Sequence, residues 1–185
     1  MTRVYLASAS PQRRRLLRSM GVRFTVVRVA YAERTRRGLS PAQNAVRLAI
    51  GKAKAAKKVR GIVIGADTLV AMGGKILGKP RDERHAYRIL KSFSGRSQKI
   101  YTGVALRDTR SGRIEAFVEC SRVTFKKMSE RDVRAYLKTG EYRGKAGAFG
   151  LQGKGRHLIR SVSGSRSNII GLPLEKLKRI LKRML

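Results

Sequence analysis

The chain has 185 residues, of which 44 are Lys or Arg and 11 are Asp or Glu, so its formal net charge is +33 at pH 7. With 42% hydrophobic residues it can bury a core as one domain over 1–185, or as two lobes that share a cleft, which excludes a disordered basic tail. A single cysteine, Cys120, excludes an internal disulfide, and two distant histidines exclude a His-rich metal site. Any metal must therefore be held by carboxylates.

The basic residues are spread along the whole chain, which is typical of a solvated cationic surface. The alternative is a function in binding polyanions, and nonspecific binding to RNA or DNA is expected in either case, weakening steeply with salt. No apolar run approaches the roughly 18 to 20 residues of a membrane span, and no signal segment with a cleavage site is recognised. We therefore expect a soluble cytoplasmic protein with no membrane partner.

Short apolar runs alternate with capped helices in the first part of the chain. Ser10-Pro11 and Ser40-Pro41 are each an N-cap followed by a favourable first helical residue. The predicted elements are a strand over 4–7, a helix from Pro11 that Gly21 ends, a strand over 24–29, a helix from Pro41 with an alanine face, and a buried strand over 62–68.

The rest of the chain is predicted to form hairpins and helices. The predicted elements are a hairpin of 69–72 with 75–77, a helix from Asp82 to Gly95, a hairpin of 100–106 with 114–125, a helix from Ser129 to about Gly140, a glycine-rich segment over 144–155 and a helix from Pro173. Because strands and helices intermix, the fold class is α/β or α+β with a mixed sheet.

Acidic residues are scarce, so each can be considered in turn. Most have ordinary structural positions in turns or helix starts, and we interpret five glutamates as exposed: Glu115, Glu119, Glu130, Glu141 and Glu175. Asp67 differs, because it ends the most hydrophobic strand, where α/β proteins present ligand-binding groups. A carboxylate there must be paired, metal-bound or functional, unless it merely caps the following turn.

Other motifs are individually weak. The turn from Ser8 to Arg13 presents hydroxyls, backbone N–H groups and a helix N-terminus, which suits a phosphate but also suits a simple cap. Lys79 can be an ordinary loop lysine, and the glycine-rich segment around Gln152 can be an ordinary turn region.

Their joint order along the chain is more informative. The segments are Ser8-x-Ser10-Pro11-x-Arg13, Lys52, Gly65-Ala66-Asp67-Thr68, Gly78-Lys79-Pro80, Thr102-Gly103, residues 145–153 and Ser165-x-Ser167-Asn168-x-x-Gly171-Leu172-Pro173. Over essentially the whole chain they resemble the Maf family of nucleoside triphosphate pyrophosphatases. The resemblance implies an elongated, twisted mixed β-sheet flanked by helices, with two lobes around a deep cleft, similar to inosine triphosphate pyrophosphatases. It also implies a cytoplasmic homodimer that cleaves nucleoside triphosphates to monophosphate and pyrophosphate.

The resemblance assigns roles to ten residues. Asp67, Lys52 and Lys79 are the implied catalytic residues, with Asp67 as proton acceptor; Ser8, Ser10, Gln12, Arg13, Thr68 and Gln152 bind substrate; Glu33 and Asp67 hold a divalent metal, Mg²⁺ or else Mn²⁺ or Co²⁺. These types suit the chemistry, because a triphosphate brings about four negative charges and its cleavage depends on positioning and charge neutralisation. Mg²⁺ typically takes one or two carboxylates together with phosphates and waters.

Three positions depart from the family pattern. The branch that acts on dTTP and UTP usually has Arg at Gln12, although Thr68 and Gln152 match that branch, so we favour pyrimidine triphosphates. The family usually has Glu at Arg15 and Asp at Gly144. The main expectation is a dTTP/UTP pyrophosphatase that can also take modified nucleotides, with roles in nucleotide-pool sanitation and cell division arrest. The alternatives are a basic nucleic-acid-binding protein and a catalytically weakened Maf-like regulator of cell division.

Overall fold

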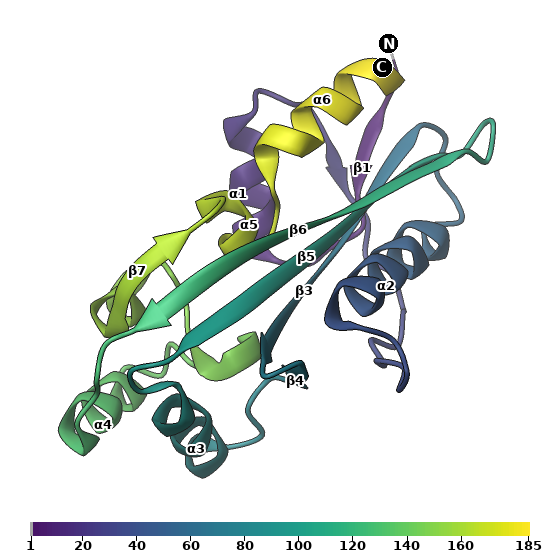
Figure 1. Ribbon diagram of the computed structural model, residues 1–185. Coiled ribbons are helices and arrows are strands. Elements are labelled where there is room, and N and C mark those ends of the chain that lie inside the picture. The colour runs from purple at the N-terminus through teal and green to yellow at the C-terminus, as the bar shows by residue number, and fades with distance from the viewer. Residues whose placement is uncertain (1) are drawn as a thin grey trace.

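A computed structural model describes residues 2–185 as one twisted, seven-stranded mixed sheet flanked by helices (Figure 1). The strand order is β2-β1-β3-β5-β6-β7, and β4 pairs with β3 beside this path. The strands are β1 (Val4–Leu6), β2 (Thr25–Val26), β3 (Ile62–Met72), β4 (Lys75–Leu77), β5 (Ser97–Asp108), β6 (Ile114–Phe125) and β7 (Ile159–Ser163). β1 is parallel to β2 and β3, whereas the other pairs are antiparallel, which confirms the predicted mixed α/β class.

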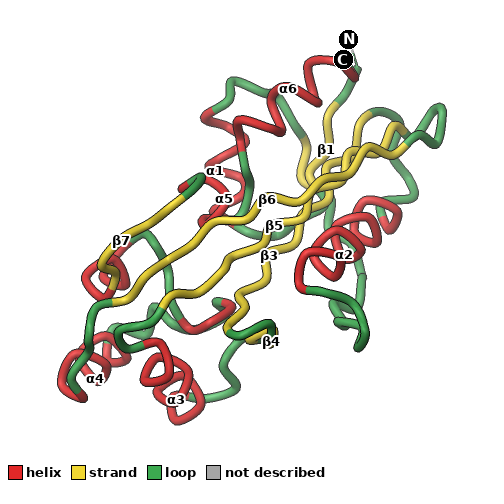
Figure 2. The backbone as a smooth tube through the Cα atoms, viewed as in Figure 1, coloured by secondary structure: helices red, strands yellow, loops and turns green. Residues whose placement is uncertain are grey.

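Helices cover the two faces of the sheet at one end and gather at the other end. They are α1 (Pro11–Ser19), α2 (Pro41–Ala55), α3 (Glu83–Phe93), α4 (Glu130–Lys138), α5 (Arg166–Ile170) and α6 (Leu174–Met184), with short 3₁₀ turns η1 (Ala146–Ala148) and η2 (Gly153–Leu158). Long β5 and β6 connect the end that carries α2 and α6 with the end that carries α3 and α4 (Figure 2). Among residues 2–185, every helix is too short or too polar to span a bilayer.

Four apolar clusters pack against the sheet, the smallest of them formed by Ala45, Leu48 and Leu69. On one face, Leu17 of α1 and Leu177 of α6 pack with Ile62 and Ile64 of β3. On the opposite face, the alanines of α2 pack with Val63. A third cluster joins α3 and α4 to the far ends of β3 and β6.

Helix α2 lies unusually close to the sheet. A Cβ atom at Gly65 would be 2.3 Å from the carbonyl oxygen of Ala49, and one at Gly103 would be 2.2 Å from that of Ala45. Only glycine permits this approach, because any side chain would push the helix away. The contact brings Lys52, near the end of α2, to the side chain of Asp67.

The sequence predicted that Asp67 ends a strand, but the structure places it in the middle of β3. β3 continues to Met72 because β5 pairs with it from Ile62 to Ala71. β1, in contrast, pairs only with Ile62–Ile64. Asp67 therefore follows the carboxyl end of the parallel pair, where the departing chain of β1 opens space beside β3. The predicted strands 62–68 and 69–72 are one strand.

Other differences are local. The strand predicted over 24–29 is reduced to Thr25–Val26, where it pairs with β1. Strand β7 and the five-residue α5 were not predicted. Both are short: β7 is defined by its pairing with distant β6, and α5 by the Ser165 cap and by buried Asn168. Such long-range contacts leave little periodic signal.

Candidate active site

A cleft of about 780 Å³ opens beside β3 and receives residues from both ends of the sheet. All ten residues that the sequence predicted for the site line it: Ser8, Ser10, Gln12, Arg13, Glu33, Lys52, Asp67, Thr68, Lys79 and Gln152. The structure therefore brings together segments that are as much as 144 positions apart, from Ser8 to Gln152 (152 − 8 = 144).

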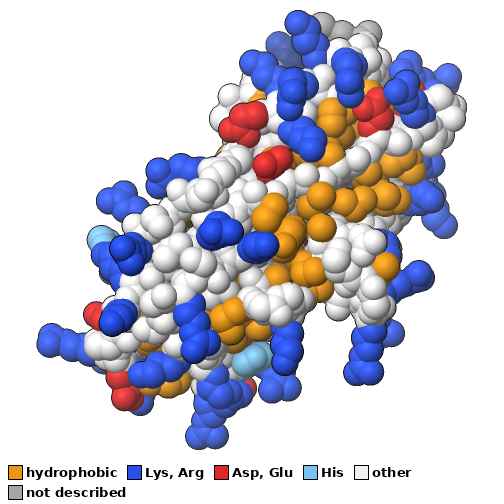
Figure 3. Space-filling view, in the orientation of Figure 1, with side chains coloured by type: hydrophobic (Ala, Val, Ile, Leu, Met, Phe, Trp, Pro, Cys, Tyr) orange, Lys and Arg blue, Asp and Glu red, His pale blue; other side chains and the backbone are white. Residues whose placement is uncertain are grey.

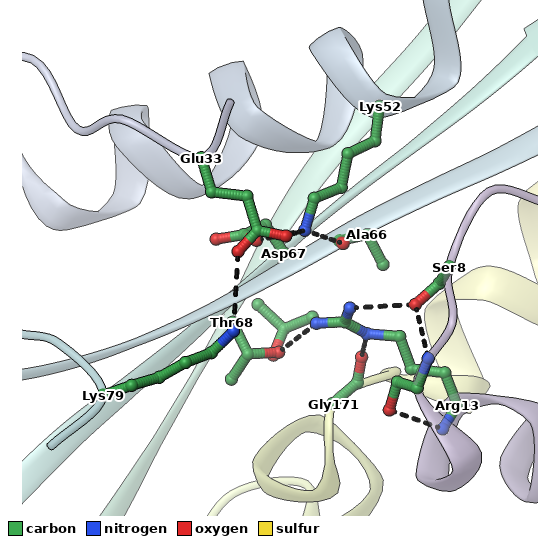
Figure 4. A network of polar contacts seen from close by, with 11 residues as sticks. Ser8, Arg13, Glu33, Lys52, Ala66, Asp67, Thr68, Lys79 and Gly171 are labelled. Carbon is green, nitrogen blue, oxygen red and sulfur yellow. Dashed lines mark hydrogen bonds and ion pairs between the residues drawn. The ribbon is translucent and has the colours of Figure 1, made fainter. Parts of the chain in front are cut away.

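The ammonium of Lys52 is at the centre of the cleft wall. Its Nζ lies 2.5 Å from Asp67 Oδ1, 2.7 Å from Glu33 Oε1 and 3.3 Å from the carbonyl oxygen of Ala66 (Figure 4). Lys52 and Asp67 are buried, whereas Glu33 is on a loop with 45% of its side chain exposed. Since a lysine has three donors, these three oxygens satisfy the ammonium completely. Lys52 therefore neutralises the two carboxylates, and each of its three donors has an oxygen partner within the chain.

Arg13 is buried and held on three sides. Its Nε donates to the carbonyl of Gly171 at 2.9 Å, Nη1 to Ser8 Oγ at 3.2 Å and Nη2 to Thr68 Oγ1 at 2.9 Å (Figure 4). Burial lowers the pKa of Arg13, and the nearby charges of Asp67 and Glu33 oppose that change. These bonds fix a guanidinium in the wall at the start of α1.

The α1 N-terminus is capped as the sequence predicted. Ser10 Oγ accepts a hydrogen bond from the backbone N–H of Arg13 at 3.4 Å and donates to Gln12 Oε1 at 3.2 Å. The N-terminus of α1 adds the partial positive charge of the helix dipole to the wall that Arg13 already makes cationic. Lys79 is exposed on the opposite side, 3.8 Å from Glu33 Oε2.

Glu33 has a perturbed pKa. Burial raises it, but the hydrogen bond and charge of Lys52, with the charges of Lys79 and Arg13, outweigh burial and hold the pKa below the ordinary value. A folded-state pKa below the unfolded one gives stability that is present above the ordinary glutamate pKa of about 4.3 and is lost as the pH falls through the folded value.

Glu33→Gln should therefore be less stable than the wild type at neutral pH, by an amount that starts to shrink as the pH falls below the ordinary glutamate pKa of about 4.3 and is lost once folded Glu33, whose pKa is lower, is protonated. Thermal unfolding of both proteins, followed by circular dichroism across this range, measures the difference. A difference that stays constant or grows on acidification would contradict the ion-pair account of Glu33.

The carboxylates fit a divalent cation only together with a substrate. Within residues 2–185, no group of three or more Asp, Glu, His or Cys side chains is arranged to hold a metal. Glu33 and Asp67 nevertheless converge on one cationic atom, Lys52 Nζ. This pair is the number of protein ligands that Mg²⁺ commonly takes when phosphates and waters complete its shell. The protein oxygens that would hold such an ion now accept hydrogen bonds from Lys52.

The cleft contains charged residues that the sequence did not assign. Six cations line it, Arg13, Arg15, Arg28, Lys52, Lys79 and Lys145, against three carboxylates, Glu33, Asp67 and Glu141, an excess of 6 − 3 = 3 positive charges. The sequence predicts Glu141 to be an exposed surface residue, but it is half-buried in the cleft wall, where its carboxylate accepts hydrogen bonds from backbone N–H groups. Nothing in its sequence context distinguishes it. Arg15 and Gly144, two of the family departures, also line the cleft.

Fold and site together define a mixed α/β protein with a cation-rich cleft centred on two carboxylates and a buried lysine. The sequence profile of the Maf-like protein family matches residues 3–184, and the chain belongs to this family. It is 41% identical to a dTTP/UTP pyrophosphatase of Carboxydothermus hydrogenoformans, covering 97% of each chain. It is 40% identical to proteins of the same name from Pelotomaculum thermopropionicum, covering 99% of this chain and 97% of the relative, and from Yersinia pestis, covering 100% and 94%.

Proposed function

We propose that this protein hydrolyses dTTP and UTP to the nucleoside monophosphate and pyrophosphate, with a divalent cation bound together with the substrate. The observation that carries the proposal is the placement of Asp67, Lys52, Glu33 and Arg13 in one cationic cleft, in a chain about 40% identical over nearly its full length to proteins named dTTP/UTP pyrophosphatase. The divalent cation would neutralise the triphosphate and would be held by Glu33 and Asp67.

The proposed reaction is attack of water on the α-phosphorus. The new bond joins the water oxygen to that phosphorus, the bond to the oxygen bridging the α and β phosphates breaks, and pyrophosphate leaves. Asp67 orients the water and accepts its proton, as a carboxylate can within hydrogen-bond reach. Arg13 and the N-terminus of α1 bind phosphate oxygens.

Lys52 has a more specific part in this proposal. Its three donors are used by Asp67, Glu33 and the carbonyl of Ala66, so it can bind a phosphate only by leaving at least one of these three oxygens. We propose that Lys52 moves to the phosphates when the substrate and its cation bind. Lys79, which is exposed at the cleft edge, binds the leaving pyrophosphate.

Base recognition is assigned to Gln12, Thr68 and Gln152. Gln12 and Thr68 already form hydrogen bonds with Ser10 and Arg13, and a glutamine at position 12 offers neither the charge nor the bidentate fork of an arginine. We therefore propose a preference for thymine and uracil that is shallower than in relatives with arginine at this position.

A screen of pyrophosphate release over purine and pyrimidine triphosphates tests the proposal, with Mg²⁺, Mn²⁺ or Co²⁺ and with EDTA. We expect turnover that requires a divalent cation and is fastest with dTTP and UTP. Sharp purine selectivity would contradict the base assignment, undiminished turnover in EDTA would contradict the cation requirement, and absence of pyrophosphate release from every nucleotide would contradict the function.

The surface charge predicts polyanion binding that is separate from catalysis. Lys and Arg side chains are scattered over the visible face and do not gather into one patch (Figure 3). A DNA duplex should therefore bind nonspecifically, with log affinity falling linearly against log salt at about 0.9 for each phosphate neutralised. Fluorescence anisotropy at several salt concentrations measures the slope. Affinity that does not change with salt would contradict a charge-driven interaction.

A homodimer and a cytoplasmic location, which the family resemblance implies, stay predictions.

A further inference from the structure

The 3₁₀ turn η2 is capped from outside its own segment. Gln152 is its N-cap residue, yet the Gln152 side chain forms no capping hydrogen bond. Instead, the backbone N–H of Lys154 donates to Glu141 Oε1 at 3.1 Å and Oε2 at 3.0 Å, and that of Gly155 donates to Oε2 at 3.3 Å. The first N–H groups of a helical turn have no partner within it, so a carboxylate is a favourable cap for them.

This external cap leaves the side chain of Gln152 unused by its own turn. Gln152 is exposed and lines the cleft, and its side chain forms no hydrogen bond in the part of the chain that the structure describes, residues 2–185. If Gln152 had to satisfy the turn that it begins, its amide would be directed at the backbone and would be lost to a ligand.

Glu141 is itself anchored to the packed end of the molecule. It follows α4, whose Val133 and Leu137 are buried in the cluster shared with α3. The backbone N–H of Glu141 donates to Thr139 Oγ1 at 3.2 Å, and Lys145 Nζ donates to the Glu141 carbonyl. The carboxylate therefore connects a rigid helix to the turn that carries Gln152.

A role for Glu141 as a third metal ligand does not fit this geometry. Both of its oxygens already accept backbone hydrogen bonds, and no metal-binding group in residues 2–185 contains it. We infer that Glu141 is a positioning residue, which caps η2 so that Gln152 faces the cleft and contributes to nucleobase selection. The selectivity part of this inference rests on the proposed function.

The capping part can be tested without any substrate. Hydrogen exchange of the backbone amides of Lys154 and Gly155, followed by NMR, should be about tenfold or more faster in Glu141→Ala than in the wild type, because hydrogen bonds to a charged group are lost. Glu141→Gln, which keeps an acceptor oxygen, should be intermediate. Glu119→Ala is the matched control, since half-buried Glu119 of β6 is outside the cleft and its side chain has no hydrogen bond or ion pair within residues 2–185. Unchanged exchange at both amides in Glu141→Ala would overturn the cap.

The positioning part is tested by nucleotide binding. The preference for the α,β-methylene analogue of dTTP over that of dCTP, measured by calorimetry, should fall severalfold in Glu141→Ala and in Gln152→Ala, and the double variant should lose no more than either single variant. Additive losses, or an unchanged preference in Glu141→Ala alone, would overturn the coupling. These analogues are not hydrolysed at the α phosphate, so the result is independent of whether the wild type releases pyrophosphate, which separates failure of this inference from failure of the proposed hydrolysis.

Discussion

Asp67→Asn is expected to reduce pyrophosphate release by about a thousandfold, since a positioned general base commonly contributes between a hundredfold and ten-thousandfold. Asparagine has nearly the same shape as aspartate, and its amide oxygen can still accept the hydrogen bond that Asp67 Oδ1 receives from Lys52 Nζ. The substitution removes the charge and the proton-accepting capacity. Activity should therefore fall much more than stability does.

A matched variant separates the site from a general loss of acidic charge. Asp108→Asn makes the same chemical change outside the cleft, at the end of β5, where half-buried Asp108 pairs with Arg110, and should leave turnover close to that of the wild type. Thermal unfolding of both variants is the check on folding. Near-normal pyrophosphate release by folded Asp67→Asn would remove Asp67 from the mechanism.

Lys52→Met is expected to lower both stability and activity. Methionine fills similar space but leaves the buried Asp67 carboxylate without its ammonium partner, and breaking a buried pair in this way commonly costs about 3 kcal/mol or more. Activity should fall because the proposed phosphate contact is lost. Urea unfolding and pyrophosphate release measure the two effects separately.

The double variant Lys52→Met/Asp67→Asn distinguishes these contributions. Removing the orphaned charge should restore much of the stability that Lys52→Met loses, while turnover stays as low as in Asp67→Asn. Lys54→Met, on the exposed side of the same helix, is the control and should resemble the wild type. If Lys52→Met were as stable as Lys54→Met, the claim that the Lys52–Asp67 ion pair stabilises the fold would be contradicted.

Much of the fold could be predicted from local signals. Serine caps followed by proline located α1 and α2, and the alanine face of α2 indicated the tight packing that Gly65 and Gly103 make possible. β7 and α5 could not be predicted, because they depend on partners far away in the chain. The prediction that Asp67 ends a strand was wrong for a related reason. The length of β3 is determined by its pairing with β5, which is about 40 residues later in the sequence.

The identities of the site residues were easier to predict than the contacts that these residues make with one another. Ser8, Arg13, Lys52 and Asp67 were each assigned a role, but the closing of Lys52 onto both carboxylates is a consequence of how α2 packs on β3. Glu141 was missed because a carboxylate that caps a turn twelve residues away resembles any surface glutamate. Among eleven acids, three line one cleft, which ordinary composition does not reveal.

Hydrolysis of dTTP in H₂¹⁸O, with mass spectrometry of both products, tests the proposed attack on the α-phosphorus most directly. The account predicts that one ¹⁸O atom enters dTMP and that the pyrophosphate is unlabelled, because the water oxygen bonds to the α-phosphorus. Label in pyrophosphate, or release of orthophosphate with dTDP, would show attack at another phosphorus and would contradict the account.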